Sequence, residues 1–256
     1  MKRTRPLKRR AKRQEPKRPE PATADPRSMD DDPVVQGILT AISQKRLKPG
    51  AKLGEDKLAS AFGTTRIHIR QALAHLASRK VVMQFPNRGA FVYRPTWEEA
   101  QEIFAARRII EAATVSAAVE RLDKQGKAQL KAHMELEANH DRNDRWASAS
   151  LTAEFHIVVA KLAGNHVLLD MTRELVLRTS LAIATYEQPG VPDCSPDAHP
   201  DIGALILARD KAGALHAMRH HLEEMEQRIR PDEGKSEVDE LTAIFQEIGA
   251  RARAGA

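Results

Sequence analysis

The sequence contains one cysteine, Cys194, among its 256 residues. An intramolecular disulfide is therefore excluded, which fits a protein kept in a reducing compartment. Aromatic residues make up only 4% of the chain, so its core must consist mainly of Ala, Leu, Ile and Val. No apolar run approaches the ~18 residues of a membrane span, and the charged N-terminus lacks the apolar segment of a secretory signal. We expect a cytoplasmic protein without membrane association.

Acidic residues are scarce in one part of the chain only. Residues 33–95 hold eleven Lys or Arg against two acidic residues, Glu55 and Asp56, which is a net charge of +9. Residues 96–256 hold 19 basic and 27 acidic residues, which is a net charge of −8. This asymmetry indicates that the first part contacts a polyanion and the second does not.

Residues 1–32 lack large apolar side chains almost completely and are rich in Lys, Arg, Pro and Glu. Such a segment cannot offset the entropy of ordering, so we expect a disordered basic tail. It is either an arm that adds non-specific affinity for DNA or a solvated extension. In the second case, translation could start at Met29 instead of Met1.

A compact unit is predicted over residues 33–95. Apolar residues at helical spacing occupy 34–42, and a short second helix is expected at 55–62. A third helix begins at Arg66, with Thr65 in position to cap it. The β-branched and aromatic segments 81–85 and 89–94 then form a hairpin. This order of elements is typical of a winged helix-turn-helix.

The third helix begins with cations, although the helix dipole disfavours them there by about 0.3–1 kcal/mol. Arg66, His68 and Arg70 occupy its first turns, and no acidic residue occurs from 66 to 80. A phosphate or a guanine edge would outweigh that cost, and the neighbouring Ile67 can contact a thymine methyl group. The pattern therefore predicts a helix that enters the major groove of DNA.

From residue 96 onward the pattern predicts helices and no strands. Thr96 and Glu99 form a capping-box pattern at the start of a long helix, 97–121. Further helices are expected at 125–139, 145–163, 166–187, 200–209 and 211–229. We assign residues 96–230 to an all-helical domain, and the family resemblance described below implies that it is an effector-binding and dimerisation domain. Residues 231–256 form a C-terminal tail in which one more helix could pack on a partner chain.

Arg107 lies in the middle of the apolar face of the long helix. A charge there is costly unless it is paired. One interpretation is a structural salt bridge with Glu111. The other is an anchor for an anionic ligand, because a guanidinium group suits a carboxylate.

The segment 47–92 resembles the DNA-binding domain of the GntR family of bacterial transcription regulators. Family positions include Pro49-Gly50, Gly63, Thr65-Arg66, Arg70 and Pro86-Asn87-Arg88-Gly89. The resemblance implies that Thr65 and Arg70 contact phosphate, that Arg66 contacts a base, and that Arg88 and Gly89 enter the minor groove. Ile67 and His68 complete the predicted DNA surface. Two departures are His68, where proline is common, and Asp56, where some members have arginine.

Residues 97–229 resemble the all-helical FCD effector domain, through "RRIIEAATVSAAVERL" (107–122), "TAEFH" (152–156) and "HPDIGALILARD" (199–210). In that family an Asp and three His bind a metal, and His156, His199 and His221 match the histidines. Thr152 stands in place of the Asp, so a Zn²⁺ or similar ion should bind more weakly or gain another ligand. Pro200 disfavours helical dihedrals at His199, whose ring could then be displaced from the site.

These observations predict a mainly α protein with an N-terminal winged helix-turn-helix and a C-terminal helical bundle. We interpret it as a homodimeric transcription regulator, a repressor rather than an enzyme, that binds double-stranded operator DNA. A small organic acid is expected near Arg107 and Thr152. The alternatives are a metal-dependent hydrolase that uses the three histidines and a DNA-binding protein without a ligand.

Overall fold

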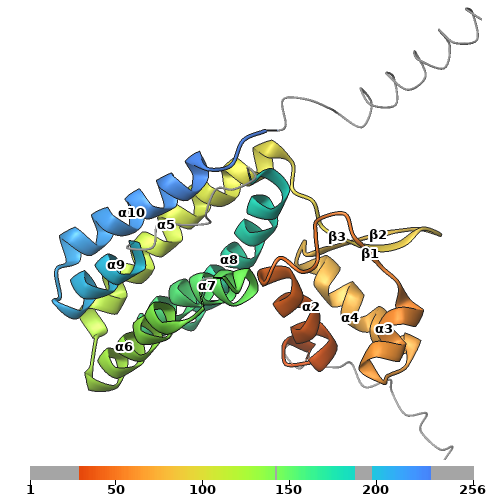
Figure 1. The fold of residues 1–256 in the computed structure, drawn as a ribbon, viewed down its shortest axis with the longest axis horizontal. Coiled ribbons are helices and arrows are strands. Elements are labelled where there is room, and N and C mark those ends of the chain that lie inside the picture. Colours follow the sequence, from red (N-terminus) through yellow and green to blue (C-terminus); the bar gives the residue numbers. More distant parts are fainter. Residues whose placement is uncertain (1–28, 142, 188–197, 232–256) are drawn as a thin grey trace, which may run out of the picture.

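The computed structural model describes residues 29–141, 143–187 and 198–231. Figure 1 shows two groups of elements, an N-terminal unit with a small sheet and a C-terminal bundle of helices. None of the helices in the described ranges combines the length and the hydrophobicity that a membrane crossing requires. Residues 1–28 of the predicted basic tail and residues 232–256 of the predicted C-terminal tail lie outside the described residues, as do residues 188–197.

The N-terminal unit is a winged helix-turn-helix, as predicted. Its elements are α2 (Pro33–Ser43), β1 (Lys52–Leu53), α3 (Glu55–Phe62), α4 (Arg66–Ser78), β2 (Val82–Phe85) and β3 (Gly89–Val92). The antiparallel sheet has the order β1-β3-β2. The sequence pattern predicted the hairpin and missed β1, because a two-residue strand carries no periodicity and forms only where β3 lies beside it.

Local signals set the turn between α3 and α4. Gly63 ends α3 with φ 61°, a left-handed conformation that glycine adopts without strain. The Thr65 hydroxyl accepts the His68 N–H at 3.2 Å and caps α4. The apolar face of α4 is fully buried in the core of the unit, at Ile69, Ala72, Leu73 and Leu76.

The C-terminal bundle is built around a long helix. Its elements are α5 (Trp97–Arg121), α6 (Lys124–Asn139), α7 (Arg145–Leu162), α8 (His166–Tyr186), α9 (Ala198–Leu207) and α10 (Lys211–Gln227). Helix α5 packs against α7, α8, α9 and α10. It starts with the predicted capping box of Thr96 and Glu99. All predicted helix bounds in the bundle agree with the structure to within two residues.

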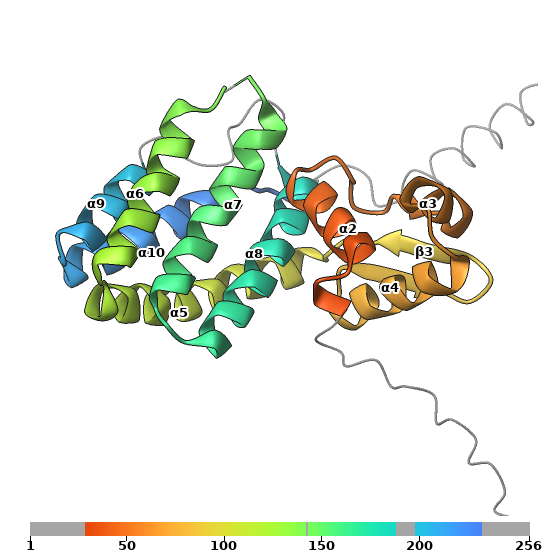
Figure 2. The ribbon, with the colours of Figure 1, turned by 90° about the horizontal axis from the view of Figure 1, so that it is seen from below.

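The two units share an apolar junction. Helix α2 packs against α8, and Leu177 and Leu181 of α8 belong to the buried core cluster of the N-terminal unit. Figure 2 shows α2 lying between α4 and α8. The turn after α2 adds an ion pair between Lys45 and Glu187 and places Arg46 over the ring of Trp146 at 5.2 Å. The DNA-binding unit is therefore docked on the bundle.

Residues 29–32, which the sequence analysis assigned to the tail, contact the winged helix. Asp32 caps α2 by accepting the N–H groups of Val34 and Val35. Asp30 pairs with both His75 and Arg79 on α4. These contacts attach the segment before α2 to the outer side of α4.

Candidate DNA surface and effector site

The cationic end of α4 is exposed. Ile67 is 70% accessible, and the side chains of Arg66 and Arg70 are 56% and 60% accessible. Figures 1 and 2 show that α3, the start of α4 and the tip of the β2–β3 hairpin lie on the side facing away from the bundle. Neither arginine is covered by the hairpin or by the bundle, so a double helix can approach both.

Acidic residues of α3 orient these arginines. Arg66 lies 3.1 Å from an Asp56 carboxylate oxygen, and the Arg70 Nε donates to Glu55 at 2.7 Å. Exposed ion pairs of this kind contribute little to stability. Their effect is to hold both guanidinium groups over the α3–α4 surface.

The other residues predicted to contact DNA are of two kinds. Some already have a partner within the protein, and the others lie at the tip of the hairpin. His68 lies 2.8 Å from an Asp32 carboxylate oxygen, and the Thr65 hydroxyl caps α4, so both have structural partners. Arg88 is exposed at the hairpin tip, with its guanidinium 5.6 Å from the centre of the Phe85 ring. Gly89 follows it with φ 92°, a conformation that requires glycine.

The three predicted metal-binding histidines meet inside the bundle. His156 comes from α7, His199 from α9 and His221 from α10, and all three are buried. Their Nε2 atoms are 3.2 Å apart between His199 and His221 and 3.4 Å apart between His221 and His156. Zn–N bonds of ~2.0–2.1 Å in a tetrahedron put neighbouring nitrogens about 3.3–3.4 Å apart. The two spacings therefore suit one shared cation.

Two carboxylates lie behind the histidines and orient them. The Nδ1 of His156 lies 2.6 Å from Glu111, and the Nδ1 of His199 lies 2.9 Å from Glu137. An ionised carboxylate only accepts hydrogen bonds, so each Nδ1 carries the proton and each Nε2 keeps a free lone pair. Glu137 was not predicted from the sequence, where its only local signal is its position four residues after His133.

The ionisation of the cluster also suits a cation. Burial, helped by the charge of Arg107, lowers the pKa of His156 to about 4. Burial and the other two histidines hold the pKa of His221 well below its usual value. Burial would raise the pKa of Glu111, but Arg107 and His156 outweigh it and set that pKa at about 2. Neutral imidazoles next to ionised carboxylates are the protonation state that metal ligation needs.

The expected displacement of the His199 ring by Pro200 does not occur. Pro200 is the third residue of α9, in the first turn, where its missing N–H would have no helical partner. His199 is therefore helical, and its ring stacks on Phe155 with 4.1 Å between centroids. Pro200 is thus compatible with a ligand role for His199.

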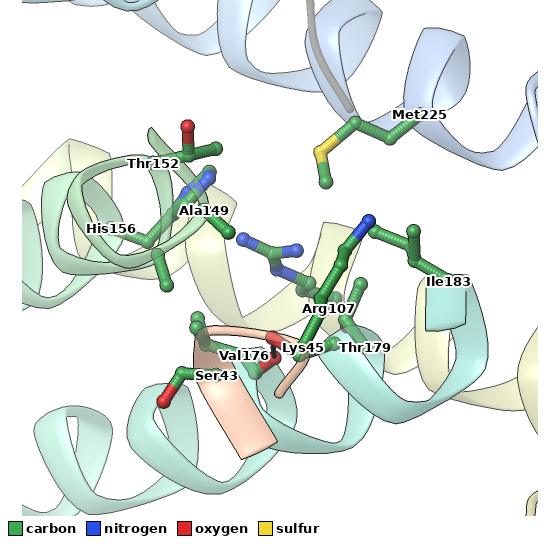
Figure 3. Close-up of a pocket in the computed structure, with 12 residues that line it drawn as sticks. Ser43, Lys45, Arg107, Ala149, Thr152, His156, Val176, Thr179, Ile183 and Met225 are labelled. Carbon is green, nitrogen blue, oxygen red and sulfur yellow. Dashed lines mark hydrogen bonds between the residues drawn. The ribbon is translucent and has the colours of Figure 1, made fainter. Parts of the chain in front are cut away.

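A cavity lies next to the histidine cluster, between α5, α7, α8 and α10. It contains about 360 Å³ of space not filled by atoms, part of it open to solvent, and its lining includes Arg107, Thr152 and His156. Figure 3 shows Arg107 pointing into it, with Thr152 one turn from His156. The Arg107 Nε donates to Glu111, as one of the two interpretations expected. Its Nη2, also buried, has no hydrogen-bond partner among the described residues.

Two family models match the chain and cover both units. The model for bacterial regulatory proteins of the gntR family matches residues 31–92, and the model for the FCD domain matches residues 102–224. The chain belongs to the GntR family and carries an FCD domain. The metal-hydrolase alternative is therefore wrong, because both domains are those of transcription regulators, and this GntR protein is a DNA-binding regulator and not an enzyme.

Curated relatives and solved structures agree with this assignment. The transcriptional repressor GlaR of Escherichia coli K12 is 29% identical over 71% of this chain and 87% of its own length. A putative L-lactate dehydrogenase operon regulatory protein of the same organism is 28% identical over 75% of this chain and 83% of its own length. The fold matches E. coli McbR/YncC with a TM-score of 0.66 at 23% identity, covering 75% of this chain and 92% of the other.

Proposed function

We propose that this GntR regulator is a homodimeric repressor whose operator affinity is set by a small carboxylate bound in the FCD cavity. The observation that carries the proposal is the buried Nη2 of Arg107, a residue that lines the cavity, since this atom has no hydrogen-bond partner among the described residues. An unsatisfied buried guanidinium N–H costs free energy, and a carboxylate from outside supplies the missing acceptor. This also favours a ligand-responsive protein over a DNA-binding protein without a ligand.

The effector would be held by Arg107 and Thr152, with a divalent cation beside it. Arg107 offers its free N–H groups, and the hydroxyl of Thr152 is on the helical turn before His156. His156, His199 and His221 have the donor atoms and the spacing for Zn²⁺ or a similar ion, and burial lowers the pKa values of His156 and His221. Such an ion would supply a Lewis-acidic position for an effector oxygen. Three protein ligands without the carboxylate that Thr152 replaces would leave room for that oxygen.

The DNA contacts would come from α4 and the hairpin. Arg66 and Ile67 would contact base edges, Thr65, His68 and Arg70 would position the helix on the phosphates, and Arg88 and Gly89 would enter the minor groove. A dimer presents two such units, and only one separation of the two fits half-sites a helical turn apart. Effector binding would shift the population between arrangements of the two units.

The DNA assignment is tested with Arg66→Ala and Arg70→Ala. Duplexes selected from a random pool by the wild-type protein serve as the operator, and affinity is titrated at several salt concentrations. We expect either substitution to abolish the gel shift while light scattering still reports a dimer. Arg173→Ala is the matched control, because Arg173 is also exposed and ion-paired but lies on α8. An unchanged affinity in the α4 variants would refute the assignment.

The effector assignment is tested by thermal unfolding with a panel of carboxylic acids, with Zn²⁺ or with a chelator. L-Lactate belongs in the panel because one relative is named for an L-lactate dehydrogenase operon. We expect at least one acid to raise the melting temperature of the Zn²⁺-loaded protein and to change operator affinity. Arg107→Met should lose both responses. If no acid and no metal changes stability or DNA binding, the effector proposal fails.

A further inference from the structure

A lysine of the DNA-binding unit lines the effector cavity. Lys45 lies in the turn after α2, yet it lines the same cavity as Arg107, His156 and Ile183 of the bundle. Only 19% of its side chain is accessible, and its ammonium group pairs with Glu187 at the end of α8. Figure 3 shows the side chain extending into the cavity, with its end drawn beside Ile183. The cavity is thus formed by both units.

The backbone at Lys45 is in a conformation that side chains disfavour. Its φ is 55°, in the left-handed region where glycine is the ordinary choice. Lys80 and Arg209 adopt the same conformation at the same position after α4 and α9, so a left-handed residue is a recurrent helix ending in this chain. Here the strained backbone and the buried course of the side chain occur at the same residue. A glycine would satisfy the turn, so the side chain is the feature that needs an explanation.

The charged side chains that line the cavity are both cationic. Two cationic groups, from Arg107 and Lys45, reach it from different units. Glu111 accepts from the Nε of Arg107 and lies beside His156, while the Nη2 of Arg107 has no hydrogen-bond partner among the described residues. The hydroxyl groups of Ser43, Thr152 and Thr179 are neutral hydrogen-bonding groups in the same lining. This distribution fits a small ligand with an anionic group at each end.

We propose that Lys45 contacts the effector directly, and that the effector is a dicarboxylate held between Arg107 and Lys45. The inference rests on the effector site proposed above and adds the ligand class and the route of regulation. One carboxylate binds Arg107, and the other exchanges with Glu187 for the ammonium group of Lys45. Because Lys45 belongs to the winged-helix unit, the bound acid joins the two units and holds the docked position of α2 on α8. Ligand occupancy thereby restricts where α4 can point.

The test compares succinate with butyrate, which has the same carbon chain and one carboxylate. Calorimetric titration of the Zn²⁺-loaded wild-type protein is expected to give at least about tenfold tighter binding of succinate, the scale of one charge-assisted contact. If succinate does not suit the spacing, malonate with propionate and glutarate with valerate extend the comparison. In Lys45→Gly the dicarboxylate advantage is expected to fall to about threefold or less, with monocarboxylate binding unchanged.

Two further variants separate charge from backbone effects. Lys45→Gln keeps the side-chain length and removes the charge, so it is expected to behave like Lys45→Gly. Lys80→Gly is the matched control, because Lys80 has φ 53° in the same unit but is exposed and does not line the cavity. It is expected to keep the wild-type preference. At saturating dicarboxylate, operator affinity should shift in wild type and Lys80→Gly but not in the Lys45 variants.

The outcomes that overturn the inference are distinct from failure of the effector site. Equal binding of monocarboxylates and dicarboxylates by wild type would refute the dicarboxylate class. A preserved preference and operator response in Lys45→Gly and Lys45→Gln would refute the role of Lys45 while Arg107→Met still loses binding. If wild type binds no carboxylate of either kind, the proposed effector site itself fails and the inference falls with it.

Discussion

Two residues of the histidine cluster, His156 and His199, are oriented by carboxylates behind them. His156 is buried and neutral, and its Nδ1 proton is held by Glu111, which Arg107 keeps ionised. Glu137 does the same for His199 from α6. Carboxylates in this position fix the tautomer and raise the basicity of the ligating nitrogen. The cluster is thus five interacting residues and Arg107, rather than three histidines alone.

The orienting role of Glu137 leads to a prediction for metal affinity. Glu137→Gln is expected to weaken Zn²⁺ binding by about 10–100-fold, because an amide orients His199 less strongly than a carboxylate. The measurement is competition with a chromophoric chelator. Glu135→Gln, an exposed position on the same helix, serves as the control and should bind Zn²⁺ as wild type does. Equal affinities in both variants would contradict the role of Glu137.

The pKa shifts predict how the metal-free protein responds to acid. The folded-state pKa of His156 is about 4, below the usual value of 6.5, and that of His221 is lowered in the same direction. Between pH 6.5 and about 4 the unfolded state binds more protons than the folded state. The free energy of unfolding should therefore fall as the pH drops through this range. The slope approaches about 1.4 kcal/mol per pH unit for His156, and His221 adds to it in the same direction.

This dependence is measured by urea unfolding in a chelating buffer from pH 7.5 to 4.5. His156→Gln is expected to flatten the profile, since one of the two groups is removed. His220→Gln, at an exposed position beside the site, is expected to leave the slope unchanged. A wild-type stability that stays constant from pH 6.5 to 4.5 would show that the two histidines are not protected from protonation.

At the scale of elements, α5 organises the bundle. A capping box at Thr96 and Glu99 closes its first turn. Near its other end, Arg209 donates to the carbonyl oxygen of Val119 at 2.9 Å and also to that of Leu122. Between these ends the helix carries Arg107 and Glu111 into the site. Because both ends of α5 are fixed by hydrogen bonds, Arg107 and Glu111 keep their positions relative to α7, α9 and α10.

Removal of the cap should destabilise the protein by a limited amount. Thr96→Ala is expected to lower the free energy of unfolding by about 1 kcal/mol, because the Glu99 N–H loses its acceptor. A chain of this size should then melt roughly 2–4 °C lower in a calorimetric scan. Thr96→Ser keeps the hydroxyl group and should melt close to wild type. An alanine variant as stable as wild type would mean that the capping box contributes nothing.

The whole molecule is characterised by a shared core between its two units. Leu177 and Leu181 of the FCD domain lie in the same cluster as Ile38 and Leu73 of the winged helix. Packed side chains and the turn that carries Lys45 therefore connect the cavity with the DNA-binding unit, which is the route that the proposed regulation would use. The acidic bundle and the basic winged helix remain separate in charge, which keeps DNA on the N-terminal unit.

The junction can be tested by shortening a side chain at its centre. Leu181→Ala is expected to cost roughly 2–4 kcal/mol of unfolding free energy, because a fully buried leucine is replaced by a cavity. The measurement is urea unfolding followed by circular dichroism. Val167→Ala, at an exposed position on the same helix, should change stability by less than about 0.5 kcal/mol. A small effect at Leu181 would mean that the units are only loosely docked.

The amino-acid sequence by itself determined the features that depend on neighbours along the chain. Helix periodicity and caps predicted α2 through α10, and the missing acids from Arg66 to Lys80 predicted an exposed cationic face on α4. The three histidines were assigned through the resemblance to the FCD domain. Such signals are local, because helix ends and amphipathic faces are set within a few residues.

Only the tertiary structure decided what depends on distant segments. It paired β1 with β3, placed Glu137 behind His199, and kept the His199 ring in the cluster although Pro200 follows it. It also brought Lys45 of the winged helix into the cavity of the bundle. No periodicity encodes these contacts, because each joins residues from different elements, and packing of the apolar faces fixes how those elements meet.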